Sequence, residues 1–67
     1  MKIFIEEYSL RLQSHDQEER ACFMQKCNKL GITVKKNKIG HLDAFGSSEQ
    51  LYALIFILTL EWNLTIH

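Results

Sequence analysis

Cysteine and histidine are the residue types in this chain that could bind a metal or act as nucleophile and base. The candidates are scattered along the sequence: His15, Cys22, Cys27, His41 and His67. Zinc sites commonly draw on local pairs of the form Cys-x-x-Cys or His-x-x-x-His, and no two candidates form such a pair. The spacing therefore predicts no metal site, and nothing in the chain calls for a cofactor.

The two cysteines lie five residues apart within one predicted helix. That spacing turns their side chains about 140° apart, so we expect free, partly buried thiols rather than a disulfide. A cysteine nucleophile would need His41 and an acid beside it. Glu6 and Glu7 are neighbours on a predicted strand and point to opposite faces, so they form no carboxylate pair. The chain is therefore predicted not to be an enzyme.

Three lysines, Lys35, Lys36 and Lys38, surround Asn37 in a predicted hairpin. Such a basic tip can contact phosphates. The cluster indicates one possible function, a nucleic-acid-binding module that uses the hairpin tip and the exposed face of the sheet.

The segment Ile3-Phe4-Ile5 resembles the opening of the ribonucleoprotein sheet motif of RNA-recognition domains. Phe45 ends a predicted strand, where that family stacks bases on aromatic rings. The resemblance implies a sheet that binds RNA. The glycine and aromatic spacing after Lys38 departs from the family pattern, and this chain is shorter than a usual domain of that kind.

The composition is that of a globular protein, with 67 residues, 46% hydrophobic and 24% charged, and a net charge of zero. This length predicts one domain, residues 1–67. The longest apolar stretch is interrupted by Thr59 and Glu61 and falls short of the ~20 residues that span a membrane. Glu6 and Glu7 come too early for a signal peptide. We expect a cytoplasmic protein, without a membrane segment and without an evident small-molecule substrate.

A strand is predicted from Ile3 to Leu12, followed by a helix from His15 to Leu30. The apolar positions change parity at Glu6-Glu7, which indicates a bulge there or a strand apolar on both faces near its start. Ser14 and Gln17 have the spacing of a capping box. Gly31 suits the left-handed residue that closes a helix.

Two registers are possible for the hairpin between Ile32 and Phe45. A two-residue loop would set Val34 opposite Ile39, and a five-residue loop from Lys36 to Gly40 would set it opposite Leu42. The longer loop places four apolar residues on one face, so we expect it. They are Ile32, Val34, Leu42 and Ala44.

A second helix is predicted to begin with a capping box of Ser47 and Gln50 and to end near Asn63, which tolerates a left-handed conformation. From Leu58 onward, however, apolar and polar residues alternate, which indicates a strand that overlaps the end of this predicted helix. The resulting order is strand, helix, strand, strand, helix, strand. It predicts an α+β domain with a ferredoxin-like, four-stranded antiparallel sheet and two helices on one face.

Apolar residues continue around the far side of this second helix. Tyr52, Phe56 and Leu60 follow one another at spacings of four, with Ala53 beside them. Either the first helix covers this stripe, or the stripe contacts another chain, since interface cores enrich aromatic residues. We expect a small, non-catalytic protein–protein interaction or regulatory module, associating as a homodimer or docking on a larger protein partner.

Overall fold

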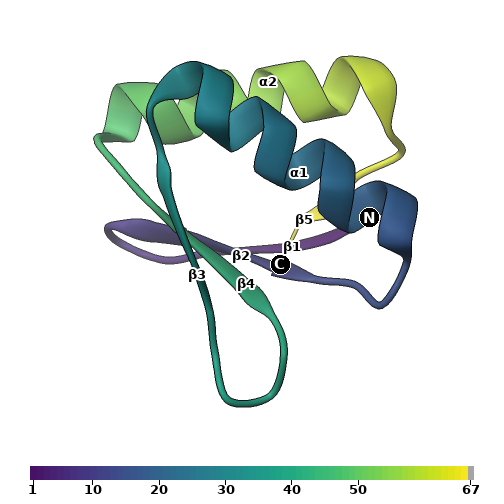
Figure 1. The fold of residues 1–67 in the computed structure, drawn as a ribbon. Helices are drawn as coiled ribbons and strands as arrows, with labels where there is room; N and C mark the ends of the chain where they lie inside the picture. The colour runs from purple at the N-terminus through teal and green to yellow at the C-terminus, as the bar shows by residue number, and fades with distance from the viewer. Residues whose placement is uncertain (67) are drawn as a thin grey trace.

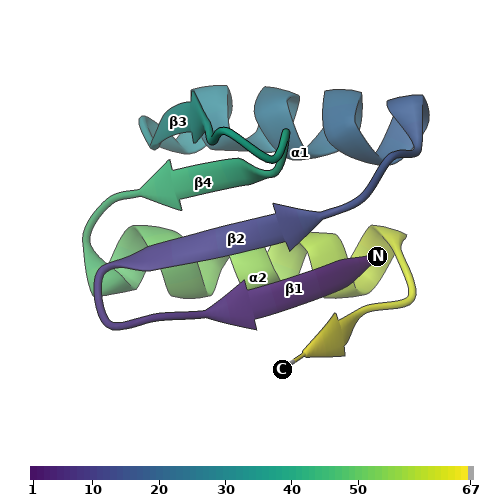
Figure 2. The same ribbon diagram turned by 90° about the horizontal axis from the view of Figure 1, so that it is seen from below.

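The computed structural model describes residues 1–66. Within them the elements follow in the order β1 (Lys2–Ile5), β2 (Ser9–Gln13), α1 (Gln17–Leu30), β3 (Thr33–Lys36), β4 (Leu42–Phe45), α2 (Ser48–Glu61) and β5 (Thr65–Ile66). Both helices lie on one face of a single sheet (Figure 1). The other face of the sheet is open, as the view from below shows (Figure 2). The predicted α+β class and the placement of both helices are confirmed.

The predicted first strand, Ile3 to Leu12, is wrong, because the chain turns back in its middle. β1 and β2 form an antiparallel hairpin that pairs Ile3 with Leu12 and Ile5 with Leu10. Its turn is closed by the N–H of Glu6, which donates to the carbonyl of Ser9 at 2.9 Å. The parity change thus marks a reversal of direction rather than a bulge or a two-faced strand.

The sheet has five strands in the order β3-β4-β2-β1-β5. β2 and β3 are both antiparallel to β4, whereas β5 is parallel to β1. The sheet is therefore mixed, and the predicted four-stranded antiparallel strand order is not confirmed. The difference arises at the β1–β2 hairpin, which supplies two strands where the sequence pattern indicated one.

The start of α1 lies at Asp16, not at the predicted cap Ser14. The Asp16 carboxylate accepts hydrogen bonds from the N–H groups of Glu18 and Glu19 at 2.8 and 3.1 Å, which satisfies two donors that the first helical turn leaves unpaired. Ser14 instead accepts from the N–H of Asp16 at 3.1 Å. At the other end Gly31 closes the helix in the left-handed region, with φ of 73°, as predicted.

The β3–β4 hairpin has a register that neither prediction gives, since Val34 pairs with Ala44. The connecting segment is five residues long, but it runs from Asn37 to His41. The Asn37 side chain fixes it by accepting from the N–H groups of Ile39 and His41 at 3.0 and 2.9 Å. Gly40 completes the turn with φ of 97°. The shift is two positions, so the predicted apolar face is preserved.

The capping box of Ser47 and Gln50 begins α2 as predicted, but the predicted end at a left-handed Asn63 is wrong. The helix ends at Glu61, and Trp62 is already extended, with φ of −133°. No residue among 1–66 other than glycine has a positive φ. Neither helix in this range is long and apolar enough to cross a bilayer.

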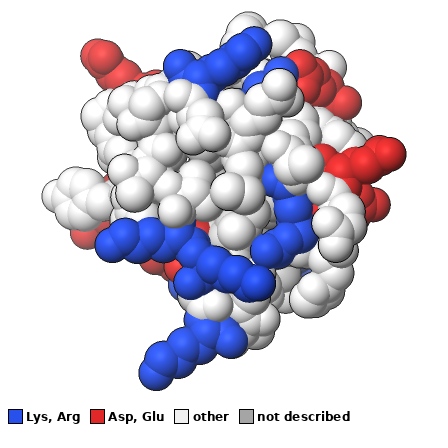
Figure 3. Space-filling view, in the orientation of Figure 1, with Lys and Arg blue, Asp and Glu red and all other residues white. Residues whose placement is uncertain are grey.

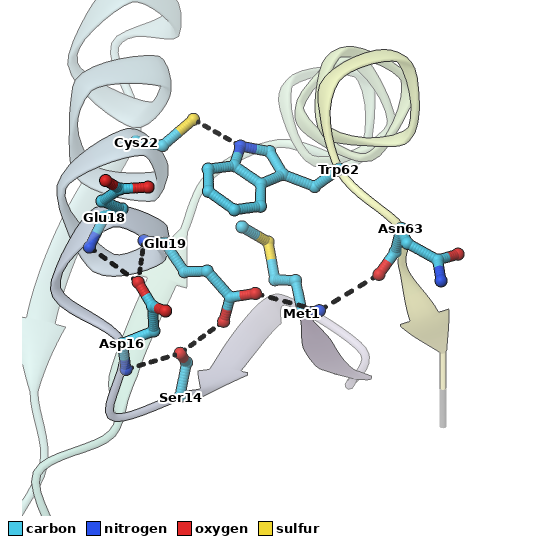
Figure 4. A network of polar contacts seen from close by, with 8 residues as sticks. All are labelled: Met1, Ser14, Asp16, Glu18, Glu19, Cys22, Trp62 and Asn63. Carbon is cyan, nitrogen blue, oxygen red and sulfur yellow. Dashed lines mark hydrogen bonds and ion pairs between the residues drawn. The ribbon is translucent and has the colours of Figure 1, made fainter.

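The two ends of the described chain meet beside α1 (Figure 4). The Met1 ammonium group lies 3.1 Å from the Glu19 carboxylate and donates to the Asn63 carbonyl at 3.1 Å. Glu19 also accepts from the Ser14 hydroxyl, and the N–H of Thr65 donates to the Met1 carbonyl at 2.9 Å. These contacts hold the short strand β5 against β1.

Replacement of the helix cap, Asp16→Ala, is expected to lower the free energy of unfolding by about 1 kcal/mol, because two N–H groups lose their acceptor. Urea denaturation monitored by circular dichroism measures this loss. His15→Ala, at an exposed neighbouring position, is the control and should change stability by less than about 0.5 kcal/mol. Equal losses in the two variants would contradict the assignment of the cap.

Candidate functional site

The inner side of α2 belongs to the core. Leu51, Leu54 and Leu58 are buried against the sheet, at the spacings of three and four that one helix face requires. Ile55 and Trp62 are partly buried beside them. This face is therefore occupied and offers nothing to a partner.

One flank of α2 is covered by α1, which runs antiparallel to it. The amide Nε2 of Gln50 donates to the Leu30 carbonyl at 2.9 Å near one end. Near the other end Lys26 Nζ lies 3.0 Å from Glu61 Oε1. The hydrogen bond from Lys26 lowers the pKa of Glu61. A lowered pKa means that the pair stabilises the fold above the ordinary carboxyl pKa, and that this contribution is lost as the pH falls through the lowered value.

The outer side of α2 is uncovered. Tyr52, Phe56 and Leu60 are 70%, 66% and 72% exposed, and Ala53 lies half-buried between them and α1. The first helix therefore does not hide the stripe, which removes one of the two alternatives that the sequence left open. The structure brings the predicted residues together as a continuous apolar surface on one chain, here called the outer stripe (Tyr52, Phe56 and Leu60).

A hollow of about 60 Å³ lies beside the outer stripe, between α2 and the β1–β2 turn. Apolar side chains such as Ile5, Leu51 and Ile55 line it together with Tyr52, and Glu6, Glu7 and Ser48 lie at it as well. Ligand pockets measure about 300–1,000 Å³, so this hollow has room for part of one side chain rather than for a metabolite. It borders the outer stripe on the side of the sheet, with a lining that is partly apolar and partly acidic.

The cysteine thiols lie in different environments. Cys27 is buried in the core, and burial raises the pKa of its thiol to about 12. Cys22 is half-buried, and its sulfur accepts a hydrogen bond from Trp62 Nε1 at 3.0 Å (Figure 4). Both are free. Trp62 thus ties the end of α2 to α1, and Cys22 has a packing role.

The histidines stand at separate positions in the chain, His15 before α1 and His41 before β4. His15 is exposed before α1, and His67 lies outside the described residues. His41 Nδ1 is buried without a hydrogen-bond partner. Across residues 1–66 no group of three or more histidine, cysteine or acidic side chains could hold a metal ion.

The three predicted lysines do not gather on one face. Lys35 pairs with Asp43 on the open side of the sheet, whereas Lys36 pairs with Leu42 on the opposite side. Lys38 lies in the loop at the tip. Sequence reasoning missed Arg11, which lies next to Asp43 on the open face, with Nε 2.8 Å from Oδ1. The sequence signal for its position was that it lies between Leu10 and Leu12 on a strand and so points to the face opposite these buried residues.

Comparison with known proteins adds no family to this description. No protein-family model matches the chain, and neither the curated proteins nor the solved structures give a significant match.

The difference between the two thiols predicts selective modification. Iodoacetamide at pH 8 should label only Cys22 in the folded protein, because Cys27 is buried and a raised pKa leaves almost no thiolate. Mass spectrometry should find one label on the native protein and two after unfolding in guanidinium. Cys22→Ser should abolish native labelling. Two labels added to native protein at equal rates would contradict the burial of Cys27.

Proposed function

We propose that this protein is a small, non-catalytic interaction module that associates with a second copy through the outer stripe of α2. The observation that carries the proposal is the exposure of Tyr52, Phe56 and Leu60 in one continuous row. Exposed apolar patches of this kind mark interaction sites. Free thiols at Cys22 and Cys27 support a cytoplasmic setting for the module.

The outer stripe is suited to pairing with itself. In a twofold, antiparallel pair of α2 helices with the axis at Phe56, the two Phe56 rings would meet, and Tyr52 would lie against Leu60 of the second copy. A twofold interface requires this kind of self-complementarity. A central aromatic residue with apolar neighbours is also typical of the residues that dominate binding energy.

Few polar groups would need to be dehydrated on this face. Thr59 lies on the same side of the helix, and its hydroxyl already donates to the Ile55 carbonyl at 2.7 Å. Burying a hydroxyl is costly mainly when it loses its hydrogen bond. Acids lie near the stripe at its Tyr52 end: Glu49 stands in the first turn of α2, two turns before Phe56, and Glu6 and Glu7 border the hollow beside Tyr52.

The size of the surface predicts weak association. An aromatic side chain buries about 150–250 Å², so the exposed parts of the outer stripe offer roughly 300–500 Å² per copy, and a pair would bury roughly 600–1,000 Å². Stable interfaces begin near ~1,000 Å². We expect a reversible dimer with a dissociation constant in the micromolar range.

We also propose that the architecture is a ferredoxin-like arrangement with its first strand doubled. Counted as one strand, the β1–β2 hairpin lies between β5 and β4, and β3 forms the far edge. β5 is parallel to β1 and hence opposite in direction to β2, which is the relation expected between the first and last strands of the split βαβ arrangement.

The decisive variant for self-association is Phe56→Glu. Two carboxylates facing each other at the centre of the pair should weaken dimerisation at least about tenfold, because like charges across an interface are strongly unfavourable. Sedimentation velocity between 10 and 500 micromolar, chosen as roughly the range for such a weak interface, measures the change. The fold should persist, since the side chain is 66% exposed.

Met24→Glu is the matched control, because Met24 is an exposed apolar residue on α1, 46% accessible. It should dimerise like the wild type. A wild-type protein that stays monomeric through the whole concentration range would overturn self-association, and unfolding of Phe56→Glu would show that Phe56 belongs to the core.

A covalent test addresses the symmetry. In a Cys22→Ser background, Phe56→Cys places a thiol at the proposed twofold axis, where two copies can form a disulfide. Oxidation should give a covalent dimer on non-reducing gels faster than the same background with Lys29→Cys, an exposed position on α1. Equal rates would rule out an axis at Phe56.

A further inference from the structure

The zero net charge conceals a strong separation of charge between the sheet and the rest of the molecule. Within the described residues, the strands and the β3–β4 loop carry five lysine or arginine side chains and a single acid, Asp43. The helices and the other loops carry three basic and seven acidic side chains. In Figure 3 lysine and arginine gather across the lower part of the molecule, where Figure 1 has the β3–β4 hairpin.

The strand register places a row of side chains across the open face. Phe4 of β1 pairs with Arg11 of β2, Arg11 with Asp43 of β4, and Asp43 with Lys35 of β3. Paired residues point to the same side of a sheet. Their neighbours along the strands, including Ile3, Leu10 and Ala44, are buried toward the helices, so this row points away from them.

Two further residues extend the row on the same face, since alternate residues of a strand share one side. Lys2 stands two residues before Phe4, and Phe45 stands two residues after Asp43, with 41% of its surface exposed. The open face thus combines two aromatic rings with three cationic side chains and one acid.

The acid on this face is already engaged. Arg11 Nε lies 2.8 Å from Asp43 Oδ1, and the hydrogen bond with Asp43 raises the pKa of Arg11, which keeps the guanidinium charged. The charge of the face stays positive after this pairing, with Lys2 and Lys35 on either side of the Arg11–Asp43 pair. The loop of the β3–β4 hairpin, which Arg20 of α1 holds by donating to the Gly40 carbonyl at 2.8 Å, carries one more cation, Lys38.

We propose that the open face of the sheet binds single-stranded nucleic acid. Bases would stack on Phe4 and Phe45, and phosphates would contact Lys2, Arg11 and Lys35. The combination favours this ligand because stacking on aromatic rings accepts any base, while cations track the phosphate backbone. A duplex keeps its bases stacked inside and could not use the rings. The site lies on the opposite side of the molecule from α2 and does not depend on self-association.

The binding test uses fluorescein-labelled 12-mers of dT and rU and measures anisotropy. The association constant should fall steeply between 50 and 200 mM NaCl. The slope of its logarithm against the logarithm of the salt concentration should be about −2, since each contacted phosphate contributes roughly −0.7 for a single strand. Lys35→Gln should flatten the slope by about 0.7. Lys29→Gln, the same change of charge on α1, is the control and should leave the slope unchanged.

The stacking test is Phe45→Leu, which removes the ring and keeps an apolar side chain. It should raise the dissociation constant of both 12-mers roughly fivefold or more, because the loss of one stacking ring lowers the affinity for a single strand by about this factor. Phe56→Leu makes the same change on α2 and should have no effect. Circular dichroism of each variant verifies that the fold is retained.

Several results would overturn this proposal. They are the absence of binding to either 12-mer at 50 mM NaCl, equal effects of the two lysine variants or of the two phenylalanine variants, and equal binding of a dT·dA duplex of the same length. Binding to phosphatidylcholine vesicles containing phosphatidylserine, with no binding to the 12-mers, would overturn it as well and would assign the basic face to an anionic membrane surface.

Discussion

One layer of apolar side chains between the sheet and the two helices holds this protein together. Strand residues such as Ile3, Leu10 and Leu12 and helix residues such as Phe23 and Leu54 are all fully or almost fully buried in it. A chain of this size can build only one such layer. Among the described residues, the open face of the sheet and the outer side of α2 consequently remain without cover from the rest of the chain. Both proposed sites lie on these surfaces because the core leaves them there.

The features that the sequence predicted well depend on local chemistry. Ser47 and Gln50 form their capping box, and Gly31 closes α1, because each acts within one turn of helix. The apolar row on the far side of α2 was predictable from spacing alone, but its exposure was not, because the sequence left open whether the first helix covers it.

The features that the sequence did not predict depend on contacts between residues distant in the chain, or on which of several nearby residues forms the turn. The β1–β2 turn contains no glycine, proline or asparagine, so the parity change at Glu6-Glu7 resembled a bulge. The register of the β3–β4 hairpin follows from side-chain hydrogen bonds of Asn37, and the hydrophobic pattern could not select it, because a shift of two positions leaves the same residues on the apolar face. The open-face row joins Arg11 to Asp43, 32 residues away, and it could not be assembled before the first hairpin was known.

The outer side of α2 and the open side of the sheet face in opposite directions, because the two layers are stacked. Two copies joined through α2 would therefore form a four-layer particle with the helices inside and a sheet on each outer surface. If both proposed sites operate, a single strand bound on one sheet could not continue directly onto the other. Such a pair would behave as a bivalent crosslinker of separate strands, whose avidity depends on the length of nucleic acid between the bound segments.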